Sequence, residues 1–284
     1  MFGFIGKKIK NVERPIGKPR VLVFANQKGG VGKTTTAINL GCAITEKGYK
    51  VLIIDLDPQG NASTGLGINK ESREFSSYDV LVDQMSIGKA TVKTTVNDLY
   101  LVPSTLDLLG IEATLASDKN RSFKLKDAIQ NMLLEATTTK DNYHYILIDC
   151  PPSLNLLTIN ALVASDAVMV PLQCEFFALE GLGQLLETVD HIRKTLNENL
   201  VIHGIVLTMF DERNNLSGQV EKDVREYMSD KVYKTVIPRN VRVSEAPSYG
   251  KPVLIYDHKC SGSKAYIKLA SEVLSRDKNM KYNN

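Results

Sequence analysis

The sequence is poor in the features that build metal clusters, disulfide frameworks and membrane spans. Its 284 residues include only four cysteines, which are far apart with no C-x-x-C pair, and four histidines, which are equally scattered. No zinc or iron–sulfur site is therefore indicated, and the cysteine usage is that of a reduced, cytosolic protein. No apolar run approaches the roughly 20 residues needed to span a bilayer. The N-terminal apolar stretch is too short for a secretory signal and lacks a small-residue cleavage site.

Charge is nearly balanced over the chain but unevenly distributed. The sequence has 35 basic and 32 acidic residues, a formal charge of +3. Residues 1–20 contain six basic residues and one acidic residue, so the remainder is slightly acidic. Any DNA binding by the folded body must therefore depend on a local patch. We expect residues 1–19 to form a flexible basic extension, with weak adhesion to DNA or an anionic membrane as the alternative.

Apolar, strand-like segments alternate with helix-like segments along the chain. Strands are expected at residues 21–24, 51–54, 99–103, 145–149, 167–171, 202–209 and 232–237. Helices are expected from residue 35 onward and at residues 78–82, 123–135, 179–196 and 265–274. This alternation predicts an α/β fold: a doubly wound, mostly parallel sheet flanked by helices, in one large domain or at most two.

A glycine-rich segment, FANQKGGVGKTTT at residues 24–36, lies between the first strand and the first helix. Its glycines let the backbone approach an anion closely, and the helix N-terminus adds partial positive charge. This context predicts a phosphate-binding loop, in which Lys33 reaches the β and γ phosphates and the Thr34 hydroxyl coordinates Mg²⁺.

The loop departs from the G-x-x-x-x-G-K-[ST] pattern at one position, where Gln27 replaces the first glycine. Lys28 follows it. Because this second lysine repels Lys33, several phosphate charges must lie between the two to make the pair favourable. A solvated surface role for Lys28 is the alternative.

Acidic residues end two of the expected strands. Asp55 and Asp57 follow one buried strand, and Asp149 ends another in the manner of a Walker B acid. Carboxylates at the C-terminal ends of parallel strands lie at the ligand edge of the sheet. A turn or helix cap before Pro58 is the alternative for Asp55.

Taken together, these motifs resemble the ParA/Soj partition ATPases, within the MinD-like deviant Walker P-loop proteins. The resemblance covers residues 20–275, which would be the ATPase domain between the extension at 1–19 and a polar tail at 276–284. It is carried by residues 28–35 (KGGVGKTT), 55–61 (DLDPQGN), 148–153 (IDCPPS), 173–181 (QCEFFALEG) and 236–247 (VIPRNVRVSEAP). The first motif is common to the superfamily, whereas the last two are more specific to Soj-like members.

The resemblance implies slow ATP hydrolysis with Mg²⁺ and an ATP-dependent homodimer. In this family the lysine that matches Lys28 contacts the partner's nucleotide, and the residue that matches Asp57 orients the attacking water. The implied catalytic residues are Lys28, Lys33 and Asp57, and the implied metal-site residues are Thr34, Asp55 and Asp149.

Nucleotide contacts are implied in the loop and after the late strands, where adenine would pack. The residues are Lys28, Gly29, Gly30, Val31, Gly32, Lys33, Thr34, Thr35, Met209, Pro238 and Asn240, with Phe210 also in reach. Ordinary core and turn roles remain the alternative for the residues after the late strands.

The resemblance also implies nonspecific binding of double-stranded DNA by the dimer, through Arg213 and Arg242. A salt bridge or a solvated surface position is the alternative role for each arginine. A ParB/Spo0J-like centromere-binding protein would stimulate hydrolysis, and the dimer would drive chromosome or plasmid segregation in the cytoplasm, associated with the nucleoid.

Three other classes compete with this interpretation. A MinD-like membrane-associated positioning ATPase needs a C-terminal amphipathic membrane helix. The apolar stripe there is better explained by packing on the sheet, so no stable membrane insertion is expected; it consists of Tyr266, Leu269, Ala270, Val273 and Leu274. An iron–sulfur carrier would need more than Cys150 at the site, and a tyrosine kinase would need more than Tyr282 in its tail.

Overall fold

A single seven-stranded sheet forms the centre of the computed structural model, which describes residues 18–139 and 142–279. The strand order is β3-β4-β2-β5-β1-β6-β7, and all neighbours run parallel except β3 and β4. The strands are β1 (Arg20–Phe24), β2 (Val51–Asp55), β3 (Val92–Lys93), β4 (Leu99–Val102), β5 (Tyr145–Asp149), β6 (Ala167–Gln173) and β7 (Val201–Thr208). The predicted doubly wound, mostly parallel sheet is confirmed.

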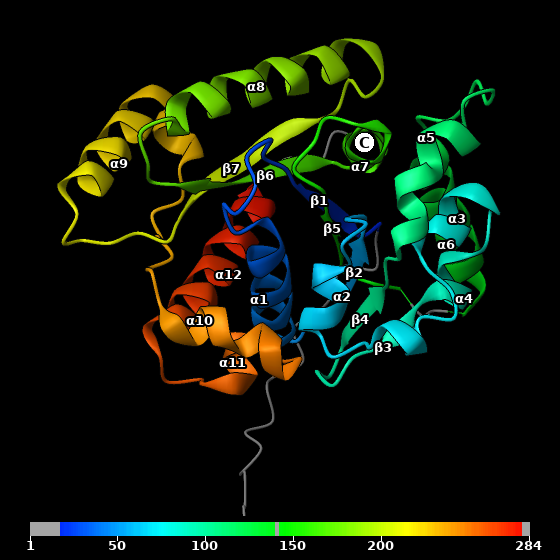
Figure 1. The fold of residues 1–284 in the computed structure, drawn as a ribbon, viewed down its shortest axis with the longest axis horizontal. Coiled ribbons are helices and arrows are strands. Elements are labelled where there is room, and N and C mark those ends of the chain that lie inside the picture. Colours follow the sequence, from blue (N-terminus) through cyan, green and yellow to red (C-terminus); the bar gives the residue numbers. More distant parts are fainter. Residues whose placement is uncertain (1–17, 140–141, 280–284) are drawn as a thin grey trace, which may run out of the picture.

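Helices cover both faces of this sheet (Figure 1). One face carries α1 (Lys33–Thr45), α2 (Asn61–Gly65), α10 (Val241–Glu245), α11 (Val253–Tyr256) and α12 (Ser261–Asn279). The other carries α3 (Ser77–Val82), α4 (Ile87–Ala90), α5 (Ile111–Thr114), α6 (Lys124–Thr139), α7 (Leu156–Ala164), α8 (Ala178–Thr195) and α9 (Asn215–Met228).

The strand sequences follow from this two-sided cover. In β1, Val21 and Val23 pack into one core, while Leu22 and Phe24 pack into the core on the opposite face. Strands with both faces covered read as continuous apolar runs rather than alternating ones. The central strands were therefore recognisable in the sequence almost to the residue.

The expected strand at residues 232–237 is wrong, because this segment makes only isolated contacts with the sheet edge. The N–H groups of Tyr233 and Ile237 donate to the carbonyls of Ile205 and Leu207 at 2.9 and 2.8 Å. Between them, the N–H of Thr235 donates to the Glu272 carboxylate at 3.1 Å. This side-chain contact from α12 interrupts the ladder. The sequence also missed strand β3 and helices α2, α4, α5, α7, α9, α10 and α11.

Helix α12 confirms the expected packing of the apolar stripe. Tyr266, Leu269, Ala270 and Val273 are buried in the core beside α1. The helix is longer than expected and runs on to Asn279. The basic extension expected at residues 1–19 lies outside the described residues except for its last two, as do residues 280–284 of the polar tail. The division of the chain into extension, domain and tail stays a prediction.

The last described turn of α12 is fixed to the amino ends of three strands by one buried carboxylate. Asp277 accepts hydrogen bonds from Arg20 Nε at 3.1 Å, His203 Nε2 at 3.0 Å and Tyr145 Oη at 2.7 Å. Burial opposes its charge, but the His203 hydrogen bond and the charges of His203 and Arg20 hold the pKa of Asp277 below its ordinary value. The folded state therefore favours the ionised carboxylate.

We expect Asp277→Asn to lower the free energy of unfolding by about 3 kcal/mol at pH 7, because Arg20 and His203 lose the buried negative charge they face. A carboxyl group with a lowered folded-state pKa stabilises the fold above its unfolded pKa of about 3.9, and this stabilisation is lost as the pH falls through the folded pKa. The difference between the two proteins, measured by urea unfolding, should accordingly shrink at acidic pH. Asp190→Asn removes two surface ion pairs on α8, with Arg193 and Lys194, and should change little. A pH-independent difference would contradict this account.

Candidate functional site

The glycine-rich loop joins the end of β1 to the start of α1 at the carboxyl edge of the sheet. Gly30 and Gly32 have φ angles of 75° and 87°, the left-handed region that favours glycine, and Gly32 is the N-cap of α1. Val31 is buried, and its carbonyl accepts a hydrogen bond from the Thr208 hydroxyl at 2.8 Å. The loop is thus held against β7, with the helix N-terminus open to an anion.

The Lys33 side chain folds back onto the backbone of the glycine-rich loop. Its Nζ donates to the Lys28 carbonyl at 2.9 Å, and the side chain is buried. Burial lowers the pKa of Lys33, and the nearby charges of Asp149 and Asp57 oppose that effect. A phosphate group in the loop would further favour the charged ammonium.

Asp149 and Asp55 lie side by side on the adjacent strands β5 and β2, both fully buried. Burial raises the pKa of both carboxyl groups, and the charge of Asp55 raises that of Asp149 further. For Asp55, hydrogen bonds from Ser63 and from the Asp57 N–H oppose the effect of burial. Two ionised carboxylates at this spacing need a cation near them.

The two carboxylates differ in what already binds them. The Asp55 oxygens accept from Ser63 N at 2.9 Å, Ser63 Oγ at 2.7 Å and Asp57 N at 3.2 Å. Neither Asp149 oxygen has a hydrogen-bond partner among the described residues, although Lys33 and the Thr34 hydroxyl lie close enough to favour its charged form. Asp149 and Thr34 therefore fit a Mg²⁺ site, whereas Asp55 is already engaged in holding α2.

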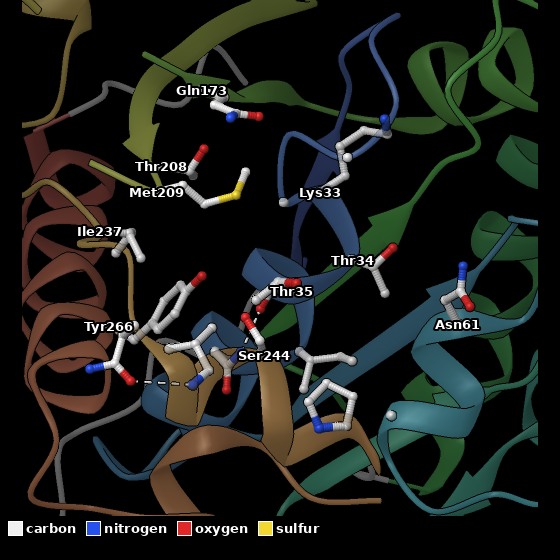
Figure 2. A pocket seen from close by; sticks show the side chains of 18 of the residues that line it. Lys33, Thr34, Thr35, Asn61, Gln173, Thr208, Met209, Ile237, Ser244 and Tyr266 are labelled. Carbon is white, nitrogen blue, oxygen red and sulfur yellow. Dashed lines mark hydrogen bonds between the residues drawn. The ribbon is translucent and has the colours of Figure 1, made fainter. Parts of the chain in front are cut away.

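A cavity of about 790 Å³ opens beside the loop, within the range of small-molecule sites. Figure 2 shows side chains from the loop, β6, β7 and the C-terminal helices converging on it. The predicted residues that line it are Gly29, Gly30, Gly32, Lys33, Thr34, Thr35, Asp57, Met209, Pro238 and Asn240. Lys28, Val31, Asp55 and Asp149 are not among its lining residues.

Met209 and Asn240 reach the cavity in different ways. Met209 has a φ of 50° and points its side chain into the space (Figure 2). The Asn240 side chain caps α10, accepting from Arg242 N at 2.9 Å, and donates to Ser261 Oγ at 2.8 Å. Asn240 thus has a structural role whatever it does for a ligand. Phe210 packs with the core instead.

Several lining residues were missed in the sequence. They include Gln59, Asn61, Gln173, Thr208, Arg239, Ser244, Pro247 and Tyr266. Gln173 and Thr208 are the last residues of β6 and β7. The rule that polar residues at strand carboxyl ends face the ligand could have found these two. Tyr266 was interpreted as core, and it is buried yet borders the cavity.

Lys28 lies at the mouth of the loop. Its side chain is 44% exposed and forms an ion pair with Glu175, in the loop after β6. Its backbone N–H donates to Asn26 Oδ1 at 3.0 Å. Lys33 therefore lines the cavity, whereas Lys28 does not line it and is held by Glu175.

Arg213 and Arg242 both lie on the surface, and each is paired with an acidic neighbour. Arg213 makes a two-pronged contact with Asp211, through Nε at 2.9 Å and Nη2 at 2.8 Å, which lowers the pKa of Asp211 to about 2. Arg242 Nη1 donates to Glu245 at 3.0 Å, with Asp257 at 3.7 Å from its Nε. A polyanion bound there would compete with these carboxylates for the two guanidinium groups.

The chain is similar in sequence to known proteins along most of its length. A family model described as an AAA domain matches residues 19–202. The chain is 60% identical to the chromosome partitioning protein ParA of Caulobacter vibrioides, over 91% of this chain and 95% of that protein. It is 52% identical to the sporulation initiation inhibitor protein Soj of Bacillus subtilis, over 89% of this chain and 98% of that protein.

A similar solved structure is that of cobyrinic acid a,c-diamide synthase from Mycobacterium smegmatis, which contains a bound ATP analogue and magnesium. The two chains are 36% identical and superpose with a TM-score of 0.78, and the match covers 92% of this chain and 96% of that one. This likeness agrees with the nucleotide-binding geometry of the loop. The sequence relatives, which are much closer in identity, identify the group within this fold. The chain belongs to the ParA/Soj family of chromosome-partitioning ATPases.

Proposed function

We propose that this protein hydrolyses ATP slowly with Mg²⁺, dimerises when ATP is bound, and in that state binds double-stranded DNA without sequence preference to drive chromosome or plasmid segregation. The observation that carries this proposal is the division between the two loop lysines. Lys33 faces the cavity of its own subunit, while Lys28 lies outside that cavity and is partly exposed. It remains available to a nucleotide held by a second copy.

The residues of the site divide the work of phosphoryl transfer. The loop N–H groups and Lys33 would hold the β and γ phosphates, and Thr34 with Asp149 would hold Mg²⁺. When bound, Mg²⁺ neutralises charge on these phosphates. Asp57 faces the cavity with only 8% exposure, and we assign it the orientation of the attacking water. Because positioning is the main contribution and a carboxylate rather than an arginine is assigned to the attacking water, we expect hydrolysis to be slow.

The role of Asp55 is less direct than the sequence suggested. Its oxygens already accept hydrogen bonds from Ser63 and Asp57, so we assign it to the support of the site rather than to the first coordination sphere of the metal. Its negative charge still lies beside that of Asp149.

The proposed dimerisation depends on the charges of the two loop lysines and of the bound phosphates. A loop with two lysines is favourable only when concentrated phosphate charge lies between them. In a face-to-face dimer, each Lys28 would leave Glu175 and meet the nucleotide of the partner. ADP offers this lysine less charge than ATP, so pairing depends on the γ phosphate.

We expect Lys28→Ala to retain most of its affinity for ATP but to lose ATP-dependent dimerisation and DNA binding, because the side chain does not line its own cavity. Sedimentation with a non-hydrolysable ATP analogue measures dimerisation, and retention on DNA should fall at least about tenfold when bivalent contact is lost. Lys194→Ala, which removes another exposed, ion-paired lysine, is the matched control. A Lys28→Ala protein that still dimerises would overturn the proposal.

DNA binding is proposed for a surface that includes Arg213 and Arg242. Arginine contacts with phosphates carry no sequence information and weaken with salt. Pairing of two subunits doubles the contacts, which couples DNA affinity to ATP.

We expect Arg242→Glu to abolish ATP-dependent binding of a random-sequence duplex at low salt, with dimerisation unchanged. Arg193→Glu is the control, because it makes the same charge change on α8, where the arginine is also paired with an aspartate. Equal loss in both variants would show a general charge effect, and undiminished binding by Arg242→Glu would remove this residue from the DNA surface.

The acidic partner of Arg213 gives a test in the opposite direction. Because Asp211 competes with phosphate for Arg213, Asp211→Asn should tighten DNA binding by about twofold to fivefold while it keeps a hydrogen-bond acceptor at that position. Asp190→Asn, which frees Arg193 and Lys194 instead, makes the same change in net charge and should leave DNA affinity nearly unchanged. Equal affinities of the Asp211 variant and the wild type would argue against Arg213 as a phosphate contact.

The partner and location follow from the same proposal. A ParB/Spo0J-like centromere-binding protein would stimulate hydrolysis, and the DNA-bound dimer would be nucleoid-associated in the cytoplasm. The membrane-associated alternative receives no support from α12, whose apolar stripe is buried in the core. Within residues 18–139 and 142–279, no helix combines the length and apolar character needed to cross a bilayer. Liposome flotation beside DNA retention separates the two alternatives.

A further inference from the structure

Two buried polar side chains near the ends of β2 and β4 have no role assigned from the sequence. Ser104 is fully buried just after β4, and Arg73 is 9% exposed before α3. Neither lines the nucleotide cavity. Both are directed at the turn that carries Asp57, the residue proposed to orient the attacking water.

That turn spans Asp57 to Gly60 and is anchored at its backbone. The Gly60 N–H donates to the Asp57 carbonyl at 2.8 Å, and the Ser104 hydroxyl donates to the same carbonyl at 2.5 Å. The Gln59 N–H donates to Asp57 Oδ1 at 3.0 Å. Ser104 is therefore the contact that ties the turn to the neighbouring strand.

Arg73 holds the far side of the same turn. Its Nη1 donates to the Ser104 carbonyl at 2.9 Å, and its Nη2 donates to Thr64 Oγ1 at 2.8 Å and to the Gly60 carbonyl at 3.4 Å. Both Nη2 and Nε also reach the Ile68 carbonyl, at 2.9 and 3.3 Å. One planar guanidinium thus joins the turn, α2, the segment after it and the end of β4.

The fit between this guanidinium and the turn is close. Gly60 has a φ of 62°, and a Cβ placed there would lie 2.3 Å from Arg73 Nη1. Burial lowers the pKa of Arg73, and the charges of Asp55 and Glu71 oppose that effect. The guanidinium charge of Arg73 therefore faces several backbone carbonyls at once. Only a planar side chain with several N–H donors can hydrogen-bond to all of them together.

The contacts extend to the buried carboxylates. The Ser104 N–H donates to Ser63 Oγ at 3.1 Å, and that hydroxyl donates to Asp55 Oδ2 at 2.7 Å. Ser104 therefore contacts both the backbone of Asp57 and the residue that supports Asp55. A shift of this serine would move both acids of the β2 end together.

We propose that Ser104 and Arg73 are positioning residues for ATP hydrolysis, which hold the Asp57 turn at the distance from the nucleotide that the attacking water requires. The inference rests on the proposed role of Asp57. Since a misplacement of about 1 Å can cost on the order of 100-fold in rate, loosening this turn affects hydrolysis far more than nucleotide binding, which depends on the separate glycine-rich loop.

The test compares Ser104→Ala and Arg73→Lys with the wild-type protein. We expect kcat for ATP to fall about tenfold or more in both, while the affinity for a fluorescent ATP analogue changes less than about twofold. Lysine keeps the charge of Arg73 but cannot bridge its acceptors. If Arg73→Lys does not fold, Ser104→Ala carries the test alone.

A matched control separates positioning from a general loss of stability. Ser165→Ala removes another buried serine hydroxyl, which donates to the Ala161 carbonyl at 2.7 Å beside the amino end of β6, at the opposite edge of the sheet. It should lower the thermal midpoint about as much as Ser104→Ala but leave kcat unchanged. Equal loss of kcat in the two serine variants would overturn the inference.

Asp57→Ala distinguishes this inference from the function on which it rests. If Asp57→Ala hydrolyses ATP at the wild-type rate, the proposed role of Asp57 is wrong. If Asp57→Ala is inactive while Ser104→Ala and Arg73→Lys keep the wild-type kcat, the role of Asp57 stands and the positioning inference fails. A parallel loss of ATP affinity and kcat in the two variants would also reject it, because that pattern marks a structural role.

Discussion

Uncompensated charge at the carboxyl edge of the sheet is the constraint on which the rest of this structure depends. Asp55 and Asp149 are fully buried on neighbouring strands, and both oxygens of Asp149 lack a hydrogen-bond partner among the described residues. Lys33, also buried, loses much of its hydration beside them. Such groups are costly unless a cation and a polyphosphate complete them. The buried charges at this edge of the sheet are therefore balanced best when a metal ion and a nucleotide bind there together.

The same arrangement explains how a binding loop becomes a switch. The glycines direct Lys33 inward and leave Lys28 at the mouth of the loop, in an ion pair with Glu175. Surface ion pairs of this kind are weak, so a concentrated phosphate charge on a second subunit can replace Glu175. The arginines proposed for DNA are likewise held by carboxylates. In both proposed interactions, with the partner's nucleotide and with DNA, a basic side chain thus exchanges a carboxylate of its own chain for a phosphate.

The sequence predicted best where one physical requirement determines the residue. Strands covered on both faces must be continuously apolar, and Tyr145–Asp149 was predicted to the residue. The glycine-rich loop joins β1 to α1 and Asp149 ends β5, both as the sequence predicted, while their phosphate and metal roles stay predictions. By contrast, the segment at residues 232–237 has strand-like composition, but the Glu272 carboxylate captures the Thr235 N–H and interrupts the ladder. That contact depends on α12, 37 residues further along the chain, and local composition does not encode it.

Supporting contacts in the site were hidden for a similar reason. Arg73 and Ser104 are 31 residues apart, and an arginine in a polar stretch looks like any solvated residue until the fold brings it to Gly60 and Thr64. The resemblance places Asp55 near the metal, and that assignment stays a prediction. The structure adds that the N–H and the hydroxyl of Ser63 both donate to Asp55 Oδ2, while the Asp57 N–H donates to Asp55 Oδ1.

The central claim is that the γ phosphate controls the pairing of two copies of this chain. It is tested most directly by the molar mass of the wild-type protein in solution, measured with Mg²⁺ and either a non-hydrolysable ATP analogue or ADP. The account predicts a mass close to that of two chains, each of 31.4 kDa, with the ATP analogue and that of one chain with ADP. The same mass with both nucleotides would contradict it.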